Sequence, residues 1–199
     1  MVRRRLPVPL VLLAVLASSA AALAGPYPPV PKNPADRMLR VPIDDYGHDA
    51  PKRCRRHASA GALALVSWLE HHVRGESWGI LRCERGSLHA EGRAVDWHLD
   101  AASPADRRAA RRLIALLLAT DRAGNPHALA RRMGVQELIW NCRSWWAGAE
   151  RMGRYSVCFD RRGRPRKHVN RTLGHRDHVH IGLTRAGARK RTSFWRSRG

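Results

Sequence analysis

The segment SLHAEGRAVDWHL, residues 87–99, carries the strongest structural signal in this 199-residue chain. From position 94 on, polar and apolar residues alternate as in a strand with one buried face. Ala94, Asp96 and His98 fall on one side, and Val95, Trp97 and Leu99 on the other. Gly92 permits backbone angles that a side chain would obstruct. A loop carrying His89 can therefore turn at Gly92 and bring its imidazole beside Asp96.

A second segment, DHVH, stands near the C-terminus and supplies two more histidines, His178 and His180. Side chains two positions apart on a strand share a face, so both imidazoles point the same way. If the two segments converge, His89, Asp96 and His180 form a set of nitrogen and oxygen ligands. Catalytic zinc has three protein ligands and an open position, whereas structural zinc usually has four ligands rich in cysteine. The pattern therefore predicts a hydrolase that uses zinc-activated water.

Two residues beside the predicted ligands, Asp177 and His178, are the candidates for proton transfer. In a regular strand Asp177 would face away from His178, so it reaches the site only if the backbone bends just before the strand. We favour Asp177 as the general base and His178 as the group that stabilises the charge of the tetrahedral intermediate. The opposite assignment, with His178 as the base, stays open.

The spacing of these residues resembles that of the zinc D-alanyl-D-alanine peptidases, a fold group that includes lysostaphin-type enzymes, endolysin peptidases and the hedgehog signalling domain. Three segments, at residues 91–97, 175–181 and 190–195, are closer still to secreted bacterial proteins described as extensin-like or as having an endolysin-type C-terminal domain. The resemblance extends over roughly residues 54–195, which is most of the chain.

This resemblance implies roles for individual residues. It implies that His89, Asp96 and His180 bind zinc, that Asp177 is the base, and that Ser87 helps to orient the substrate carboxylate. The peptidases also hold substrate with an upstream arginine, for which this chain offers several candidates that the sequence does not separate: Arg53, Arg55, Arg56, Arg74 and Arg82.

The N-terminal region reads as a targeting signal followed by a linker. Residues 1–24 combine three arginines, an alanine-rich apolar run and an Ala-Leu-Ala cleavage pattern, as in a secretory signal peptide; an uncleaved membrane anchor is the alternative. Residues 25–45, with five prolines before position 36, are predicted as an extended linker. Residues 46–199 then form one zinc peptidase-like domain.

Four cysteines in an exported chain predict two disulfides, for which three pairings exist. We favour Cys54–Cys83 and Cys142–Cys158, because each bond closes a local loop. The rival interpretation is a zinc site made of four thiolates. No pair of cysteines has the close spacing that such a site requires.

Hydrophobic periodicity and turn residues predict alternating helices and strands. We expect helices at 59–73, 103–120 and 125–134, strands at 78–83, 93–99, 135–141 and 179–184, and a long loop or hairpin at 143–174. The helix at 59–73 should pack through Leu63, Val66, Leu69 and Val73. These elements indicate an α+β fold: a mostly antiparallel sheet with helices on one face and a zinc cleft on the other, as in the hedgehog and D,D-peptidase group.

The expected function is a secreted, wall-associated zinc metallopeptidase that acts on peptidoglycan stem peptides as a D,D-carboxypeptidase or endopeptidase. The net charge of +21 favours an anionic cell-wall polymer as a further partner. Only 4 of the 37 basic residues are lysine, so the excess of arginine can also reflect the composition of the genome. A zinc-containing wall-binding protein without catalysis is the first alternative. A nucleic-acid-binding protein, suggested by charge alone, is the second. We expect no specific nucleic-acid partner, no membrane span after cleavage, and a monomer.

Overall fold

The computed structural model describes residue 30 and residues 32–197. The predicted signal peptide lies outside the described residues, as does most of the first half of the predicted linker.

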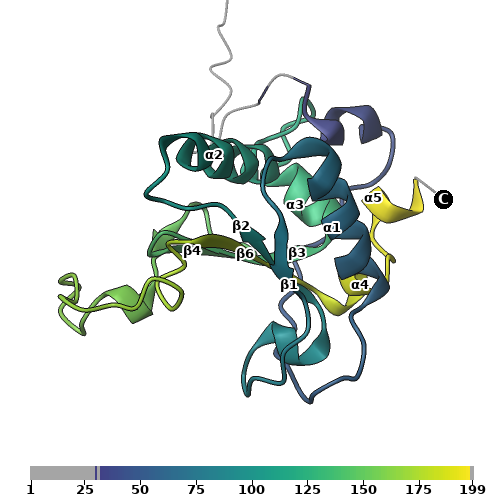
Figure 1. Cartoon of the computed structure of the whole chain (residues 1–199). Coiled ribbons are helices and arrows are strands. Elements are labelled where there is room, and N and C mark those ends of the chain that lie inside the picture. Colours follow the sequence, from purple (N-terminus) through teal and green to yellow (C-terminus); the bar gives the residue numbers. More distant parts are fainter. Residues whose placement is uncertain (1–29, 31, 198–199) are drawn as a thin grey trace, which may run out of the picture.

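A single six-stranded antiparallel sheet organises the molecule, in the order β1-β2-β6-β3-β4-β5 (Figure 1). The strands are β1 Ser77–Gly79, β2 Ala94–His98, β3 Val135–Trp140, β4 Arg143–Trp146, β5 Gly153–Arg154 and β6 His178–Leu183. Strands β2 and β6 are neighbours although about eighty residues separate them in sequence, and Asp96 lies directly opposite His180. This pairing brings the two predicted segments together.

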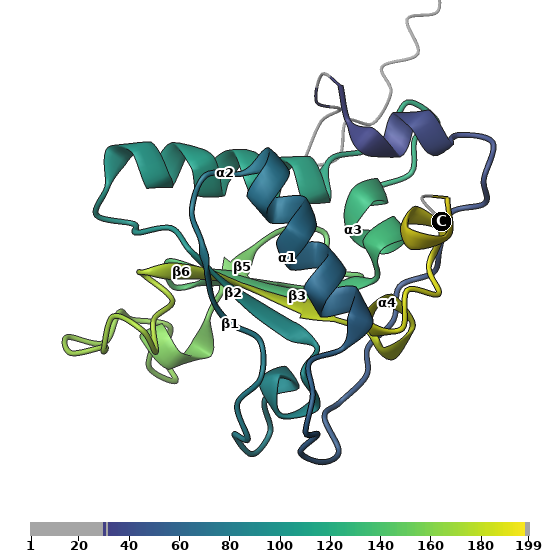
Figure 2. The same cartoon turned by 45° about the vertical axis from the view of Figure 1, so that its right-hand side comes forward.

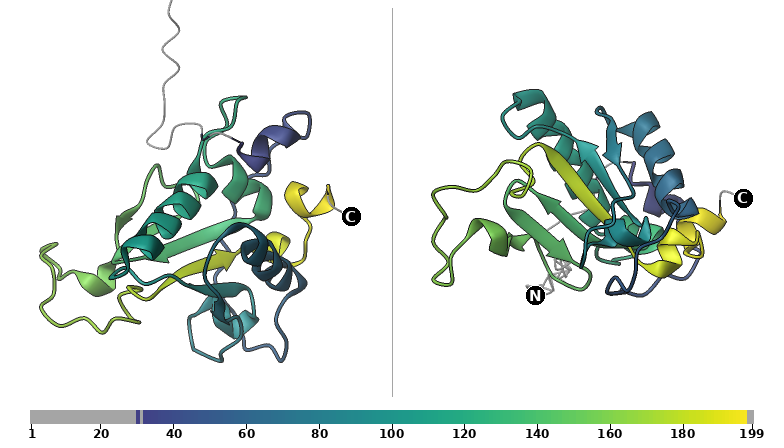
Figure 3. Two further views of the ribbon diagram at one scale, coloured as in Figure 1. Left: turned by 45° about the horizontal axis from the view of Figure 1, so that its top comes forward. Right: turned by 60° about the horizontal axis from the view of Figure 1, so that its bottom comes forward.

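Three helices cover one face of the sheet: α1 Ala60–His72, α2 Pro104–Leu118 and α3 Ala128–Met133 (Figures 1 and 2). The apolar side chains of β2, Val95 and Trp97, are fully buried beneath them. Short elements complete the fold: the 3-10 helices η1 Pro34–Met38, η2 Leu88–Glu91 and η3 Ser156–Cys158, and the helices α4 Arg185–Ala188 and α5 Ser193–Arg196. The other side of the sheet is seen in Figure 3 (right), where β6 lies in front of the long helices. The predicted α+β class is confirmed.

Most predicted elements lie within a few residues of their expected positions, but the buried face of α1 differs from the prediction. Leu69 is buried as predicted and Val66 and Val73 pack partly against the core, but Leu63 is 54% exposed, and the unpredicted Leu65 and Trp68 face the core. The helix is apolar on several sides, so more than one set of helically spaced residues could have formed the buried face. Contact with α4 selects this one: Gly61 lies against Gly187 and Ala188, where a Cβ atom would clash.

The third helix starts later than predicted, at Ala128 rather than near Asn125. Asn125 instead belongs to a turn centred on the carboxylate of Asp121, which accepts hydrogen bonds from the backbone of Ala123 and Asn125 and from the Asn125 amide. Local side-chain acceptors of this kind compete with helix formation. Gly134 ends the helix in the left-handed conformation, as predicted.

The linker prediction for residues 25–45 is wrong in its second half. Asn33 caps the η1 helix, with Pro34 in its first turn, and Ala35 and Met38 are buried in the core. Further on, the carboxylate of Asp44 accepts a hydrogen bond from the backbone N–H of Ser193. Proline at the start of a helix is favourable, so prolines that suggest a linker here begin a packed element. The folded unit therefore starts before residue 46.

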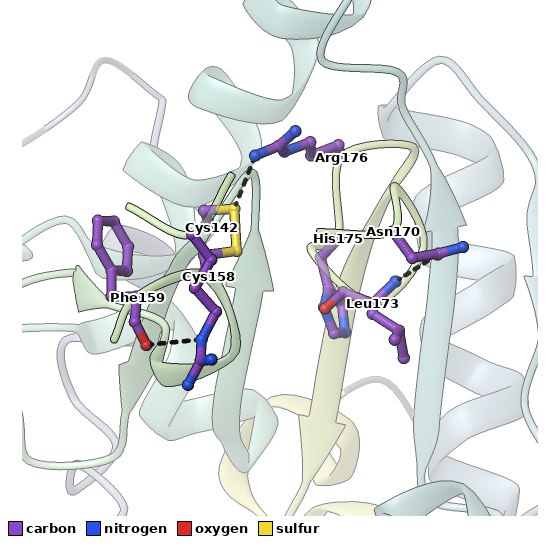
Figure 4. The surroundings of a disulfide bond; sticks show 8 residues. Cys142, Cys158, Phe159, Asn170, Leu173, His175 and Arg176 are labelled. Atoms are coloured by element: carbon purple, nitrogen blue, oxygen red, sulfur yellow. Dashed lines mark hydrogen bonds between the residues drawn. A yellow bond between two sulfur atoms is a disulfide. The ribbon is translucent and has the colours of Figure 1, made fainter. Parts of the chain in front are cut away.

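Both predicted disulfides are present, Cys54–Cys83 and Cys142–Cys158. All four cysteines are paired, so the four-thiolate interpretation is excluded. In the region predicted as a long loop or hairpin, the second bond joins the turn after β3 to η3 (Figure 4).

None of the helices in the described part of the chain is long and apolar enough to cross a membrane.

Candidate metal centre

The three predicted ligands converge on the side of the sheet opposite α1, α2 and α3. Asp96 comes from β2, His180 from β6 and His89 from η2, which lies beside β2. Nε2 of His89 lies 3.0 Å from Oδ1 of Asp96 and 3.2 Å from Nδ1 of His180, and the latter two atoms are 3.0 Å apart. All three side chains are buried.

The turn around η2 fixes the position of His89. The Ser87 hydroxyl accepts a hydrogen bond from the His89 backbone N–H at 3.2 Å and so caps the helix. Gly92 ends it with φ +62°, and a Cβ atom at this position would lie 2.6 Å from the carbonyl oxygen of His57. Glycine is therefore required both by the backbone angle and by the close approach of the neighbouring chain. The predicted turn at Gly92 is confirmed.

In both histidines, the ring nitrogen that points away from the cluster faces an oxygen acceptor. Nδ1 of His89 lies 2.8 Å from the carbonyl oxygen of Ile80, which can only accept, so this nitrogen carries the proton. Nε2 of His180 faces Oε1 of Glu137 at 3.5 Å. His89 thus turns a lone pair inward, and Glu137 lies behind His180; metal-binding histidines typically have such an acceptor behind them.

The inward atoms have the spacing of metal ligands. Bonds of about 2.0–2.1 Å in a tetrahedral zinc site place neighbouring ligand atoms about 3.3 Å apart. The observed separations are 3.0, 3.0 and 3.2 Å. Two ring nitrogens and one carboxylate oxygen at these separations can share a cation placed between them. The donor set therefore fits a divalent cation, and its two imidazoles and one carboxylate suit zinc among other ions.

The pKa shifts of the cluster residues also fit a site for a cation. Burial would raise the pKa of Asp96, but its close polar contacts with His180 and His89 outweigh burial and hold the pKa well below its usual range. For His180, burial opposes the charged form, yet Asp96 and Glu137 raise its pKa. The pKa of Glu137 is raised chiefly by burial. The carboxylate of Asp96 is thus held in its charged form at the centre of the cluster.

Asp177 and His178 lie beside the ligands as a hydrogen-bonded pair. The backbone bends at residues 176–177, immediately before β6, which is the condition under which Asp177 can reach this side. Oδ1 of Asp177 lies 2.7 Å from Nδ1 of His178, and Oδ2 accepts a hydrogen bond from Thr172 at 2.8 Å. Nε2 of His178 is 3.5 Å from Oδ1 of Asp96. His178 therefore lies between Asp177 and the ligand cluster.

His175 also faces this region, from a backbone conformation with φ +49°. Its ring centre lies 4.7 Å from that of His178 and 5.6 Å from that of His180. Burial, together with the charges of His180 and His178, lowers the pKa of His175 to about 3. In Figure 4 the ring projects from the turn beside the Cys142–Cys158 disulfide, and the Asn141 and Cys142 N–H groups bond the carbonyls of His175 and Gly174. The disulfide-linked turn thus supports the loop that enters β6.

The five arginines that the sequence offered for substrate binding have different contacts in the structure. Arg82 donates to Oδ2 of Asp96 at 2.7 Å and so contacts the cluster directly. Arg74 instead pairs with Asp106, 3.1 Å away. The others, Arg53, Arg55 and Arg56, line a separate cavity.

One polar residue of this centre, Glu137, escaped sequence reasoning. Glu137 stands in β3, which is buried along its whole length. An acidic residue within an otherwise buried strand is a signal that could have identified it, since such residues are almost never fully buried unless they are paired. Arg82 was one of the five candidate arginines, but the sequence could not single it out, because its contact with Asp96 depends on the path of an irregular loop.

Comparison with known proteins gives one match. A family model described as VldE, C-terminal domain, matches residues 52–169. The matched region includes His89 and Asp96 and ends before His180. No curated protein and no solved structure matches the chain. Because the match extends over more than half of the sequence, the chain belongs to the VldE C-terminal domain family.

Proposed function

We propose that this protein is an exported zinc-dependent peptidase that cleaves peptidoglycan stem peptides, as a D,D-carboxypeptidase or an endopeptidase. The observation that carries the proposal is the convergence of His89, Asp96 and His180, whose inward atoms lie within 4.8 Å of one another. A catalytic metal site differs from a structural one in having three such ligands rather than four. The resemblance of the motif spacing to zinc D-alanyl-D-alanine peptidases supports the choice of substrate.

In this proposal His89, Asp96 and His180 would hold zinc, which supplies a Lewis acid that polarises water and a peptide carbonyl. The Asp177–His178 pair provides the proton-transfer groups. The sequence favoured Asp177 as base; the geometry favours the pair acting together, because Nε2 of His178 is the atom that faces the cluster and Asp177 bonds its other nitrogen. Asp177 then orients the imidazole and stabilises its protonated form.

The location of the protein also belongs to the proposal. The two disulfides are typical of an oxidising compartment, as expected for a protein that acts outside the cytoplasm. Peptidoglycan, the proposed substrate, is found there.

The test is mass spectrometry of purified peptidoglycan after incubation with the zinc-loaded protein. We expect release of shortened stem peptides that stops when a chelator removes the metal. Asp177→Ala should abolish release while leaving zinc bound, since Asp177 is not among the three ligands. Equal release by wild type and Asp177→Ala would refute the enzymatic role.

The deep burial of the ligand cluster favours one alternative, a zinc-containing wall-binding protein without catalysis. The side chains of His89, Asp96 and His180 are only 2%, 5% and 7% exposed, and Arg82 occupies the second oxygen of Asp96. The same experiment separates the two functions. Bound zinc and retention on peptidoglycan, without any released peptide, would favour the alternative.

A further inference from the structure

A cavity of about 760 Å³ lies away from the metal ligands, between the loop that precedes α1 and the end of α4. Among the residues that the structure describes, six arginines line it and Glu91 is the only acidic one. The arginines are Arg53, Arg55, Arg56, Arg93, Arg185 and Arg189. Cavities of this size accept ligands larger than a single small ion.

Two of these arginines are already used within the protein. Arg93 is buried and donates to Oε2 of Glu91 at 2.6 Å. Arg185 pairs with Oδ1 of Asp49 at 2.9 Å. Burial opposes the charge of Glu91, but the hydrogen bonds from Arg93 and the Lys52 backbone lower its pKa to about 2. The carboxylate is therefore charged and matched by Arg93, so it does not neutralise the remaining arginines.

The other four arginines, Arg53, Arg55, Arg56 and Arg189, are exposed. Within the described part of the chain, their guanidinium groups have no hydrogen-bond or ion-pair partner. Ser59, the N-cap of the 13-residue helix α1, also lines the cavity, and the first turn of that helix contains no acidic residue. The helix dipole adds to the positive potential there. An accumulation of unpaired positive charge in a concave surface is typical of a site for an anion.

The shape of the cavity wall indicates which anion. The free guanidinium groups come from two segments, the loop at 53–56 and the residue that follows α4. A phosphodiester presents oxygens in different directions and can bridge donors on two walls, whereas a planar carboxylate matches one arginine fork. Among the described residues that line the cavity, none is Trp, Tyr or Phe. Single-stranded nucleic acids usually gain affinity by stacking bases on such side chains, so a polymer without bases is the better match.

We propose that this cavity binds the phosphate groups of an anionic polyol-phosphate polymer. The site extends the proposed function by giving the protein a second attachment to the cell wall, separate from the metal centre. Its test measures binding rather than peptide release, so each proposal can fail without the other.

The experiment compares two triple variants of the full zinc-loaded protein that have the same net charge. The first variant carries Arg53→Gln, Arg56→Gln and Arg189→Gln, and the second carries Arg111→Gln, Arg151→Gln and Arg161→Gln. The control arginines are exposed, do not line the cavity, and have no partner in the described structure. Affinity is measured by calorimetry over a range of salt concentrations. The probes are poly(glycerol phosphate), polyglutamate and single-stranded DNA of equal charge.

For poly(glycerol phosphate) we expect the cavity variant to lose about tenfold or more in affinity. The slope of log K against log salt should fall by about 2, since each lost phosphate contact contributes roughly 0.7. The control variant should retain most of the affinity and most of the slope. Thermal unfolding of the two variants confirms that they remain folded.

Three results would overturn the proposal. Equal losses in the two variants would show that net charge alone governs binding. Equally tight binding of polyglutamate would exclude selection for phosphate. Tighter, cavity-dependent binding of DNA than of poly(glycerol phosphate) would identify a nucleic-acid site instead.

Discussion

At the scale of single residues, the proposed metal centre depends on which nitrogen of each histidine carries a proton. The backbone carbonyl of Ile80 decides this for His89, and Glu137 lies behind His180. The convergence of His89, Asp96 and His180 could be predicted from the sequence because the spacing of these residues carries the information. The groups behind the histidines were not predicted: the carbonyl of Ile80 reaches the site through the path of a loop, and Glu137 is marked in the sequence only as an acidic residue within a buried strand.

Glu137→Gln tests the supporting role of this carboxylate. The amide removes the negative charge behind His180 while keeping a similar shape, so zinc should still bind but about 10–100-fold more weakly. Competition with a calibrated zinc chelator measures the change. Glu70→Gln, at an exposed position on α1, serves as the control. Unchanged affinity in Glu137→Gln would show that Glu137 does not support the ligand.

The buried pair of Glu91 and Arg93 should make stability depend on acid. The pKa of Glu91 is about 2 in the folded protein against a usual value of 4.5. A lowered pKa in the folded state stabilises the protein above pH 4.5, and this contribution disappears as pH falls from 4.5 toward 2. Glu91→Gln should lower the free energy of unfolding at pH 7 by about 3 kcal/mol, because Arg93 loses its buried partner. In this variant the free energy of unfolding should also fall less steeply between pH 4.5 and 2 than in the wild type.

Urea unfolding at a series of pH values checks this prediction. A parallel decline of the wild type and Glu91→Gln between pH 4.5 and 2 would contradict it.

At the scale of secondary-structure elements, β2 and β6 could be predicted from alternation, and their pairing follows once both must contribute to one site. Helix α2 matched its prediction because Ser103 and Pro104 mark its start and Leu113, Ile114 and Leu117 its buried face. The short helices that the sequence missed, η1, η2, η3, α4 and α5, are each at most five residues long. Hydrophobic periodicity needs several turns to be recognised, so such elements depend on tertiary packing.

The turn from η2 into β2 can be tested with two glycines that both have positive φ. Gly92 has φ +62° and close neighbours, whereas Gly86 has φ +78° and no atom within 4 Å of a Cβ built there. Gly86→Ala should cost about 1 kcal/mol, the usual penalty for a side chain in this region. Gly92→Ala should cost clearly more and should weaken zinc binding, because the clash with His57 displaces the turn that carries His89. Equal effects of the two variants on stability would contradict the steric argument.

The Cys142–Cys158 bond supports the approach to β6. Replacing both cysteines with serine opens a loop with a sequence separation of 16 residues. The loop-entropy relation gives a loss of about 3 kcal/mol in unfolding free energy. Because Cys142 also bonds the turn that carries His175, we expect the amide hydrogens near residues 170–176 to exchange faster in the double variant. Hydrogen exchange followed by mass spectrometry measures this rate. Unchanged protection of the segment would show that the disulfide does not support the loop that enters β6.

At the scale of the whole molecule, the two faces of the sheet have different roles. One face packs against α1, α2 and α3 to form the core (Figures 2 and 3), and the other carries the cluster of His89, Asp96 and His180. The arginine-lined cavity lies at the end of the molecule where α4 meets the loop before α1. Charge composition predicted an anionic partner but not a location, because the position of a cavity depends on how distant segments pack.

The most direct test of the metal centre is X-ray absorption spectroscopy at the zinc edge, on protein loaded with one equivalent of zinc. We predict two imidazole nitrogens and one carboxylate oxygen at about 2.0–2.1 Å, with a fourth light-atom ligand and no sulfur. His180→Ala should lose one imidazole from this spectrum. A zinc ion surrounded by water oxygens alone, or a spectrum unchanged by His180→Ala, would contradict the account.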